Sequence, residues 1–317
     1  MKFAYVTSIS PGYMFALNAN MNANMYYGTN ADFVIIQSQM EPEYMKAIEN
    51  AFPFKIKWIN RDDYSHCFHN CKYAVASTLK DDYDAICLID SDLFICCDTT
   101  PYFYRASQEN VLITAGHVWS GGDANALPFD KPESLIDRGQ AQLADFPIFI
   151  NPKFGYKLFK KWFDHTLEGR GDSEANHPLV AFNRAIVNTL KKEELVVLPG
   201  DQWVCDQNYW DYNYWQEIGE DGKQHMFSSL RGAKTPIYAI HNKWWKVGRA
   251  SGEWLAHRWV VTENNEFYMN RLTAGQNNFN NIKNMMSWFN DMTPDSKRTD
   301  FYQGTHDWKK YLETGEV

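Results

Sequence analysis

The chain has 317 residues, 44% of them hydrophobic and 16% aromatic, which is enough for a large core in one big domain or in one and a half. With 31 basic and 39 acidic side chains, the net charge is −8, and this balance disfavours a broad nucleic-acid-binding surface. No apolar run approaches the roughly 20 residues of a membrane-spanning helix. Polar and turn-forming residues over 8–12 interrupt the apolar run of a signal peptide, so we expect none in residues 1–12. We therefore expect a cytoplasmic protein without a membrane span, whose six cysteines are reduced thiols.

The first hundred residues alternate between short apolar runs, typical of buried strands, and segments with helical periodicity. Strands are predicted over residues 3–7, 32–36, 54–59 and 85–90. Helices are predicted over residues 13–27, 42–51 and 68–79. Gly28 is placed to cap the first helix. This alternation predicts a parallel α/β sheet with helices on its faces.

The remaining chain carries the same kinds of element with longer connections. Strands are predicted over residues 111–115, 146–150, 195–198 and 236–241. Helices are predicted over residues 101–106, 152–167 and 178–192. Residues 116–142 are rich in Gly, Pro and Asp, so we expect a binding or lid loop there. Residues 201–232 are aromatic and acidic, and we expect them to be irregular.

Two carboxylates follow the most apolar of these strands, Ala85–Ile89. Asp90 and Asp92 are separated by one residue, and in extended chain such residues point to the same face. Two hard oxygen donors at the C-terminal end of a strand suit Mg²⁺ or Mn²⁺. Open α/β sheets also bind their ligands at that end. The alternative interpretation is an acidic turn that only closes a strand.

A histidine and two lysines stand at the end of the last predicted strand. His241 would be a suitable third ligand for Mn²⁺ beside two carboxylates, and Lys243 and Lys246 could balance phosphate charge. Together with the acidic pair, these residues favour the ionisation of a bound diphosphate, with a metal ion as Lewis acid. Taken separately, the histidine could be a core residue and the lysines could be solvated.

Over residues 3–248 the chain resembles the glycosyltransferases of the GT-A fold, and most of all the glycogenin-like family (glycosyltransferase family eight). Short motifs carry this resemblance: Ala4-Tyr5-Val6-Thr7 with Tyr13 after it, Lys72, Leu88–Phe94, Phe146–Pro152, and Ile240-His241 followed by Lys246. The resemblance implies a GT-A-type, Rossmann-like sheet that is mixed but mainly parallel. It implies base contacts from Thr7 and Tyr13.

The same resemblance implies roles at the phosphates. Asp90, Asp92 and His241 would bind Mn²⁺ or Mg²⁺, and Lys72 and Lys246 would face the phosphates or the donor sugar. Ser91, between the two carboxylates, and Lys243 complete the predicted nucleotide-sugar-binding set.

The chain also departs from the family pattern. Where the family carries Asn-Ser-Gly before its middle strand, this chain has Asp145-Phe146-Pro147, and Asp145 could bind hydroxyls of the donor sugar. By spacing, the family's Asp-Gln pair falls near Glu174, whereas literal Asp-Gln pairs occur at residues 201–202 and 206–207. If the anomeric configuration is retained, the departing diphosphate can take the acceptor's proton. If it is inverted, Asp145, Glu174 or Asp201 would serve as the base.

The sequence thus predicts a metal-dependent glycosyltransferase that uses a nucleotide-sugar, a UDP-sugar by preference, with retention implied by the resemblance. The acceptor could be a glycan, a protein or a modified nucleobase. The predicted catalytic domain spans residues 1–250, with a nucleotide-binding half (1–115) and an acceptor half (116–250). Residues 251–317 would form an aromatic-rich extension packed on it, and this tail could also mediate homo-oligomer formation.

Two other functions stay open, together with one further metal site. A nucleotidyltransferase would share the architecture, but residues 8–12 lack the basic side chains that its phosphate loop needs. A non-catalytic carbohydrate- or nucleic-acid-binding module would have no need of a metal set at a diphosphate. His66, Cys67, His69 and Cys71 form either a metal site or the beginning of a helix with small apolar cysteines.

Overall fold

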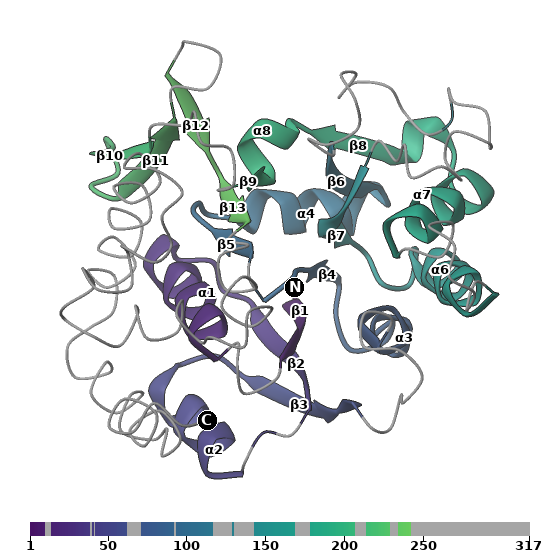
Figure 1. The fold of residues 1–317 in the computed structure, drawn as a ribbon, viewed down its shortest axis with the longest axis horizontal. Helices are drawn as coiled ribbons and strands as arrows, with labels where there is room; N and C mark the ends of the chain where they lie inside the picture. The colour runs from purple at the N-terminus through teal and green to yellow at the C-terminus, as the bar shows by residue number, and fades with distance from the viewer. Residues whose placement is uncertain are drawn as a thin grey trace, which may run out of the picture.

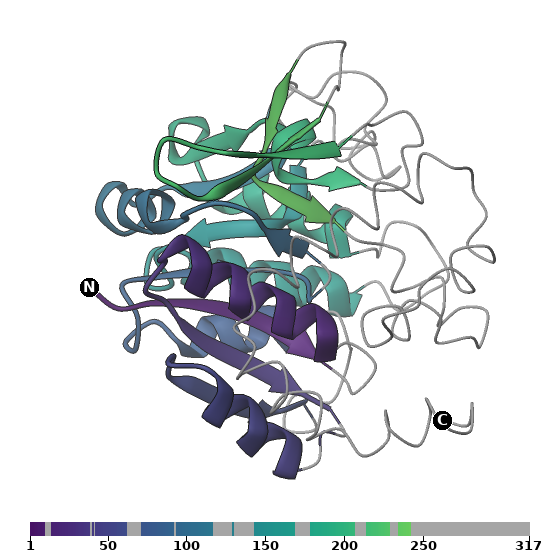
Figure 2. The ribbon, with the colours of Figure 1, turned by 90° about the vertical axis from the view of Figure 1, so that its left-hand side faces the viewer.

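The computed structural model describes residues 1–9, 14–38, 40, 42–61, 71–91, 93–116, 129, 143–168, 178–206, 214–228 and 234–241. Within these residues, a seven-stranded sheet lies between two layers of helices (Figure 1, Figure 2). Its order is β3-β2-β1-β4-β7-β6-β8. The strands are β1 (Phe3–Ile9), β2 (Asp32–Gln37), β3 (Ile56–Asn60), β4 (Ala85–Leu88), β6 (Leu112–Gly116), β7 (Leu143–Ile150) and β8 (Leu195–Leu198).

The large sheet is mixed but mainly parallel, which confirms the predicted α/β class. β1 pairs in parallel with β2 and β4, β2 with β3, and β6 with β8. Only β7, among the strands of this sheet, runs antiparallel to its neighbours β4 and β6. The carboxyl ends of the parallel strands and the amino end of β7 therefore lie on the same side of the sheet. We call this side, where those strand ends meet, the sheet edge.

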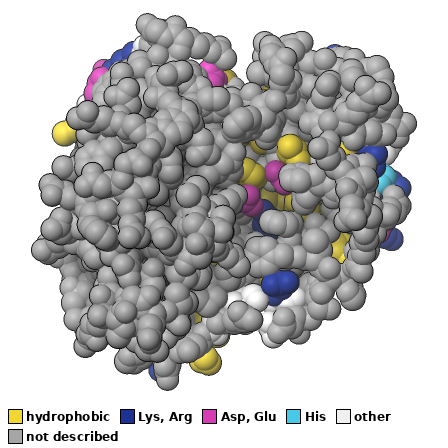
Figure 3. Space-filling view, viewed as in Figure 1, with side chains coloured by type: hydrophobic (Ala, Val, Ile, Leu, Met, Phe, Trp, Pro, Cys, Tyr) yellow, Lys and Arg dark blue, Asp and Glu magenta, His cyan; other side chains and the backbone are white. Residues whose placement is uncertain are grey.

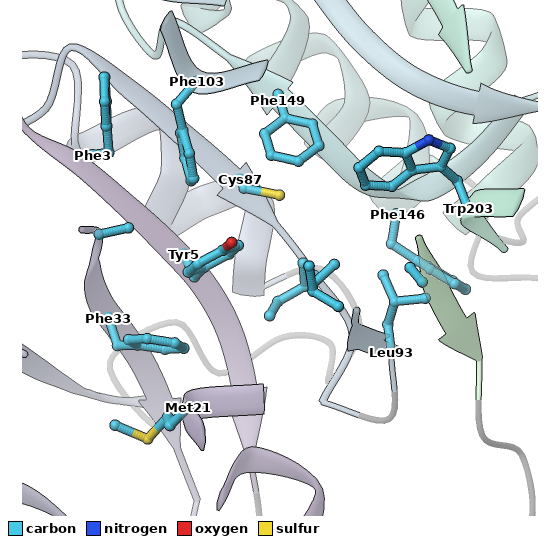
Figure 4. Packing of buried hydrophobic residues seen from close by; sticks show 14 of the residues in the cluster. Phe3, Tyr5, Met21, Phe33, Cys87, Leu93, Phe103, Phe146, Phe149 and Trp203 are labelled. Atoms are coloured by element: carbon cyan, nitrogen blue, oxygen red, sulfur yellow. The ribbon is translucent and has the colours of Figure 1, made fainter. Parts of the chain in front are cut away.

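Helices cover both faces of this sheet because its strands are apolar on both sides. In β1, Phe3 and Tyr5 face one cluster of buried residues, while Ala4 and Val6 face another. The first cluster includes residues of α1 (Met14–Tyr27), α2 (Pro42–Ala51) and α4 (Thr100–Glu109), and Figure 4 shows its aromatic centre. The second includes residues of α3 (Cys71–Thr78), α6 (Tyr156–Glu168) and α7 (Pro178–Thr189).

Two small sheets extend the carboxyl-terminal part of the described chain. One consists of β10 (Tyr214–Ile218), β11 (Gln224–Ser228) and β12 (Thr235–Ile237). The other consists of β5 (Leu93–Ile95), β13 (Ala239–His241) and β9 (Cys205–Asp206). Between β7 and β9 the chain also forms η5 (Lys192–Glu194) and α8 (Gly200–Trp203).

The hairpin of β10 and β11 is anchored to the end of α1. Gly28 ends this helix with a φ of +81°, a backbone conformation that glycine adopts without a steric penalty. The Lys223 ammonium donates a hydrogen bond of 2.7 Å to the Tyr27 carbonyl, one of the helix-end oxygens that lack a helical partner. The predicted cap at Gly28 is therefore confirmed, and it also holds a contact that is distant in sequence.

Three sequence-based expectations about local structure are wrong. Residues 201–232 are not wholly irregular, because α8, β9, β10 and β11 lie among them. The strand predicted over residues 236–241 is broken at Tyr238, whose amide donates to the Gln202 carbonyl and whose carbonyl accepts from the Cys96 amide. Those two bonds carry the chain from one small sheet into the other. The strand predicted to reach Asp90 ends at Leu88.

The described residues test several of the global expectations only in part. Within these residues, no helix has the length and apolar character required to cross a bilayer. Among the cysteines that the structure describes, Cys87 and Cys97 are free thiols, as predicted. The predicted domain end at residue 250 and the extension over 251–317 lie outside the described residues, as does most of the 116–142 loop.

Candidate functional site

The candidate site lies at the sheet edge where β4 ends and β7 begins. In the register of these strands, Leu88 pairs with Ile148, so Asp90 and Asp145 stand just beyond the same end of the ladder. Figure 3 shows a hollow over this part of the fold in which acidic, basic and hydrophobic side chains appear. The site is therefore built from the two chain segments that approach this edge from opposite directions.

A buried ion pair occupies the acidic end of β4. The Lys72 ammonium, on α3, contacts the Asp90 carboxylate. The lysine side chain is 4% exposed and the aspartate side chain 28%, so water reaches the anion but hardly reaches the cation. A buried ammonium requires a compensating charge. The structure thus brings together two of the residues predicted for the phosphate end of the site.

The segment after Asp90 is a tight turn and not an extended strand. The Leu93 amide donates a hydrogen bond of 3.1 Å to the Asp90 carbonyl, and Ser91 lies in the turn. The chain therefore turns directly after Asp90. Asp92 lies outside the described residues, so the expected same-face geometry of the two carboxylates stays a prediction.

Asn20, a residue that the sequence analysis did not single out, fixes this turn from α1. Its side-chain amide donates to the Ser91 carbonyl at 3.2 Å and accepts from the Ile95 amide at 3.3 Å. The side chain is buried among apolar neighbours of the same helix, Leu17 and Met21. A polar residue on the apolar stripe of a helix is the signal in the sequence that could have revealed this role.

His241 ends β13, beside the acidic turn. The backbone of His241 pairs with Leu93 of β5, the residue that directly follows Asp92. Opposite residues in an antiparallel pair have α-carbons about 4.5–5.5 Å apart. The fold thus brings the backbone of His241 next to Leu93, three residues after Asp90, although the two segments are far apart in sequence. Among the described residues, which exclude Asp92, no group of three potential metal ligands is found.

Asp145 lies at the amino end of β7, half-buried. It accepts a hydrogen bond of 3.2 Å from the hydroxyl of Tyr73, the residue next to Lys72 on α3. One turn of α3 therefore contacts both carboxylates at this sheet edge. Sequence reasoning selected Asp145 but missed Tyr73, because its apolar surroundings resemble those of an ordinary core aromatic.

Two other predicted residues lie near this edge. Thr7 of β1 is fully buried, and its hydroxyl has no hydrogen-bond partner in the structure as described. Such an orphan group in a folded protein is commonly satisfied by a ligand or an ordered water. Asp201 lies half-buried on α8, a helix that packs against β6 and β13. Neither residue's predicted role is tested by these positions.

The remaining predicted site residues lie outside the described part of the chain. These are Tyr13, Asp92, Glu174, Lys243 and Lys246, together with His66, Cys67 and His69 of the predicted cluster. The fourth member of that cluster, Cys71, begins α3, as the alternative interpretation of a helix start expects, but its side chain is not described. For them, base stacking, metal binding and phosphate binding remain predictions.

Comparison with known proteins gives structural neighbours only. No protein-family model matches the chain, and no curated protein matches it either. The glycosyltransferase GlyE of Streptococcus pneumoniae is similar, with a TM-score of 0.48, 17% identity, 66% of this chain covered and 48% of that chain. The bifunctional glycosyltransferase WbbM has a TM-score of 0.47, 12% identity, and coverage of 66% and 40%. An active-site mutant of LgtC has a TM-score of 0.48, 12% identity, and coverage of 75% and 86%.

The chain spans about half the length of the GlyE and WbbM chains that it matches. At 12–17% identity and TM-scores below 0.5, these likenesses carry no argument about function, and the case for a function rests on the residues at the sheet edge.

Proposed function

We propose that this chain is a glycosyltransferase that moves a sugar from a nucleotide-sugar, a UDP-sugar by preference, to an acceptor. The observation that supports it most is the meeting of a buried lysine, Lys72, with Asp90 at the sheet edge, beside the backbone of His241. Anionic ligands of open α/β sheets bind at this edge. A cation and an acidic pair are the two kinds of group that a metal–diphosphate requires.

The residues fit a divalent metal ion by their chemistry. Asp90 and Asp92 offer carboxylate oxygens and His241 an imidazole nitrogen, a donor set suited to Mn²⁺ or Mg²⁺. When bound, such an ion acts as a Lewis acid that takes up charge on the departing diphosphate. Lys72 already faces Asp90 and would supply a fixed positive charge to the same region. Thr7, with its orphan hydroxyl, is the candidate for a contact with the base.

The stereochemical course that we propose is retention. Retention requires no strong general base, since the departing diphosphate can accept the proton of the acceptor. Asp145 would then bind hydroxyls of the donor sugar, because its carboxylate stands at the same edge as Asp90. NMR assignment of the anomeric configuration in the product distinguishes this from inversion, for which Asp145, Glu174 or Asp201 would act as the base.

The first test is a thermal-shift screen against UDP-, GDP- and CMP-sugars, with and without Mn²⁺. A ligand that binds only the folded state raises the melting temperature by mass action. We expect one nucleotide-sugar to do so in a Mn²⁺-dependent way, and Asp90→Asn to abolish the shift. Asp82→Asn is the matched control, because Asp82 forms an exposed ion pair with Lys57.

The same two variants should also differ in the rate at which they release nucleotide from the donor. We expect Asp90→Asn to slow release of the nucleotide from the donor by about 100-fold, a loss typical of a removed metal ligand or its support. Asp82→Asn should leave the rate unchanged. If no nucleotide-sugar stabilises the wild-type protein, with or without metal, the transferase proposal is wrong.

A further inference from the structure

The first residues of β7 are held by buried side chains from two other elements. Asn183 of α7 accepts a hydrogen bond from the Leu143 amide at 3.3 Å and donates to the Leu143 carbonyl at 3.1 Å. The Thr114 hydroxyl of β6 donates to the Ala144 carbonyl at 2.8 Å. Asn183 and Thr114 are both fully buried. Because these bonds fix the backbone on the two residues before it, Asp145 begins from a defined position.

Tyr73 then fixes the Asp145 side chain. Its ring is 1% exposed and stacks on Trp162 of α6, which in turn packs against Phe182 of α7. A tyrosine has only two side-chain torsions, so a clamped ring sets the position of its hydroxyl. That hydroxyl donates to Asp145 Oδ2 at 3.2 Å. Hydrogen bonds to a charged acceptor are stronger than those between neutral groups.

Packing alone does not account for this hydroxyl. A phenylalanine would fill the same stack on Trp162, whereas burying a hydroxyl costs free energy unless it finds a partner. The adjacent residue of the same helix turn, Lys72, contacts Asp90. One helix turn thus orients a carboxylate on β7 and a carboxylate after β4, at a single edge of the sheet.

We propose that Tyr73 is a positioning residue, which holds the carboxylate of Asp145 in the orientation that accepts a sugar hydroxyl. The role in turnover rests on the proposed transferase function; the orientation itself does not. A carboxylate that receives a hydrogen bond from substrate must be placed within about half an ångström of its productive geometry. The stack of Tyr73 and Trp162 supplies that rigidity from outside the site.

The first test measures the turnover of the Tyr73→Phe variant. Water is the acceptor, and the nucleotide released from the UDP-sugar is measured in the presence of Mn²⁺. We expect kcat to fall about tenfold while KM changes less than twofold, because the ground-state contacts of the nucleotide remain. In the Asp145→Ala background the Tyr73→Phe change should have no further effect. A loss of tenfold in both backgrounds would overturn the proposal.

Tyr83→Phe is the matched control. Tyr83 is 8% exposed, belongs to the same buried cluster, and its hydroxyl is also paired with an aspartate, Asp32. Asp32 begins β2, at the amino ends of the parallel strands, whereas the site lies at their carboxyl ends. We expect Tyr83→Phe to leave kcat and KM unchanged. An equal drop in kcat for both variants would show general destabilisation and would overturn the positioning role.

A second readout does not depend on any enzyme activity. Urea unfolding of Tyr73→Phe, Asp145→Ala and the double variant measures the coupling between the two side chains. We expect the two effects to be non-additive, and additive effects would overturn the proposal. If the wild-type protein turns over no nucleotide-sugar, the transferase function fails, and this coupling alone decides whether Tyr73 orients Asp145.

Discussion

At the scale of single residues, the Lys72–Asp90 pair is asymmetric. Lys72 is nearly inaccessible to water, whereas more than a quarter of the Asp90 side chain is exposed. A charge that loses its partner costs more free energy the less water can reach it. Removing the anion should therefore destabilise the fold more than removing the cation, although both changes break the same contact.

The variants Asp90→Ala and Lys72→Met test this asymmetry. We expect Asp90→Ala to lower the free energy of unfolding by about 3 kcal/mol, because it leaves a buried ammonium without this carboxylate. Lys72→Met keeps the apolar stem and leaves a partly hydrated anion, so we expect about 1 kcal/mol. Urea denaturation measures both. If Lys72→Met lowers the free energy of unfolding more than Asp90→Ala does, the burial of the lysine does not decide the cost of breaking this pair.

At the scale of elements, α1 acts on the acidic turn through one amide. Asn20 contacts the backbone on both sides of residue 92, at Ser91 and at Ile95. A helix packed on the sheet thus sets the shape of a turn that follows three strands later, after β4. A turn whose shape is fixed before a ligand arrives loses less conformational entropy on binding.

Asn20→Ala should therefore weaken the Mn²⁺-dependent binding of the nucleotide-sugar. We expect an affinity loss of about tenfold and a stability loss of about 1–2 kcal/mol, because two backbone groups lose a buried partner. Isothermal titration and urea unfolding measure the two effects. Asn188→Ala is the control, since Asn188 is an exposed residue of α7 that contacts His165. Unchanged affinity in Asn20→Ala would refute a role for α1 in shaping the site.

How far the sequence predicts these elements depends on the range of the interactions that define them. The helix from residue 42 to 51 was predicted with its observed bounds, and Gly28 as a cap, because periodicity and turn chemistry are local. The break at Tyr238 was missed because it is made by bonds to Gln202 and Cys96. The apolar sequence of residues 236–241 contains no sign of those distant partners.

The same distinction applies to the candidate site. Asp90 and Lys72 were both singled out, and the structure brings them into contact. Tyr73 and Asn20 were not, because the function of each depends on which backbone or carboxylate the sheet register places opposite it. The chemistry of the residues identifies candidates for the groups that would face a ligand. It does not identify the side chains that hold those groups in place.

At the scale of the whole molecule, the core buries ionisable thiols and phenols on and beside the central strands. Burial raises the pKa of the Cys87 thiol and of the Tyr5 hydroxyl above their ordinary values, the nearby thiol of Cys87 adding to the effect at Tyr5. It also raises the pKa of Tyr83 to about 12, with Asp32 nearby contributing. In the unfolded chain these groups ionise at their ordinary values.

The sign of the pH dependence follows from this difference. Below the unfolded-state pKa of such a group, both states are protonated and the group has no effect on stability. Above that value the unfolded chain releases a proton that the folded protein keeps, so the unfolded state gains. Stability should therefore fall as the pH rises above about 8.5, first through the thiols and then, near pH 10, through the phenols.

Cys87→Ala isolates one of these contributions. At pH 7 we expect the variant to be about 1 kcal/mol less stable than wild type, because it loses a buried sulfur. Above about pH 8.5 the wild type should lose about 1.4 kcal/mol per pH unit through this thiol alone, and the variant should not. Urea unfolding at a series of pH values should then show the two stability curves crossing near pH 9–10.

Ile86→Val, on the same strand, is the control for this crossing. It also removes a small part of a fully buried side chain, at a cost of about 1 kcal/mol, but it removes no titrating group. Its stability curve should therefore run parallel to that of the wild type at every pH. If the Cys87→Ala curve is parallel as well, the thiol ionises no more readily in the unfolded chain than in the folded core, and the alkaline loss of stability has another origin.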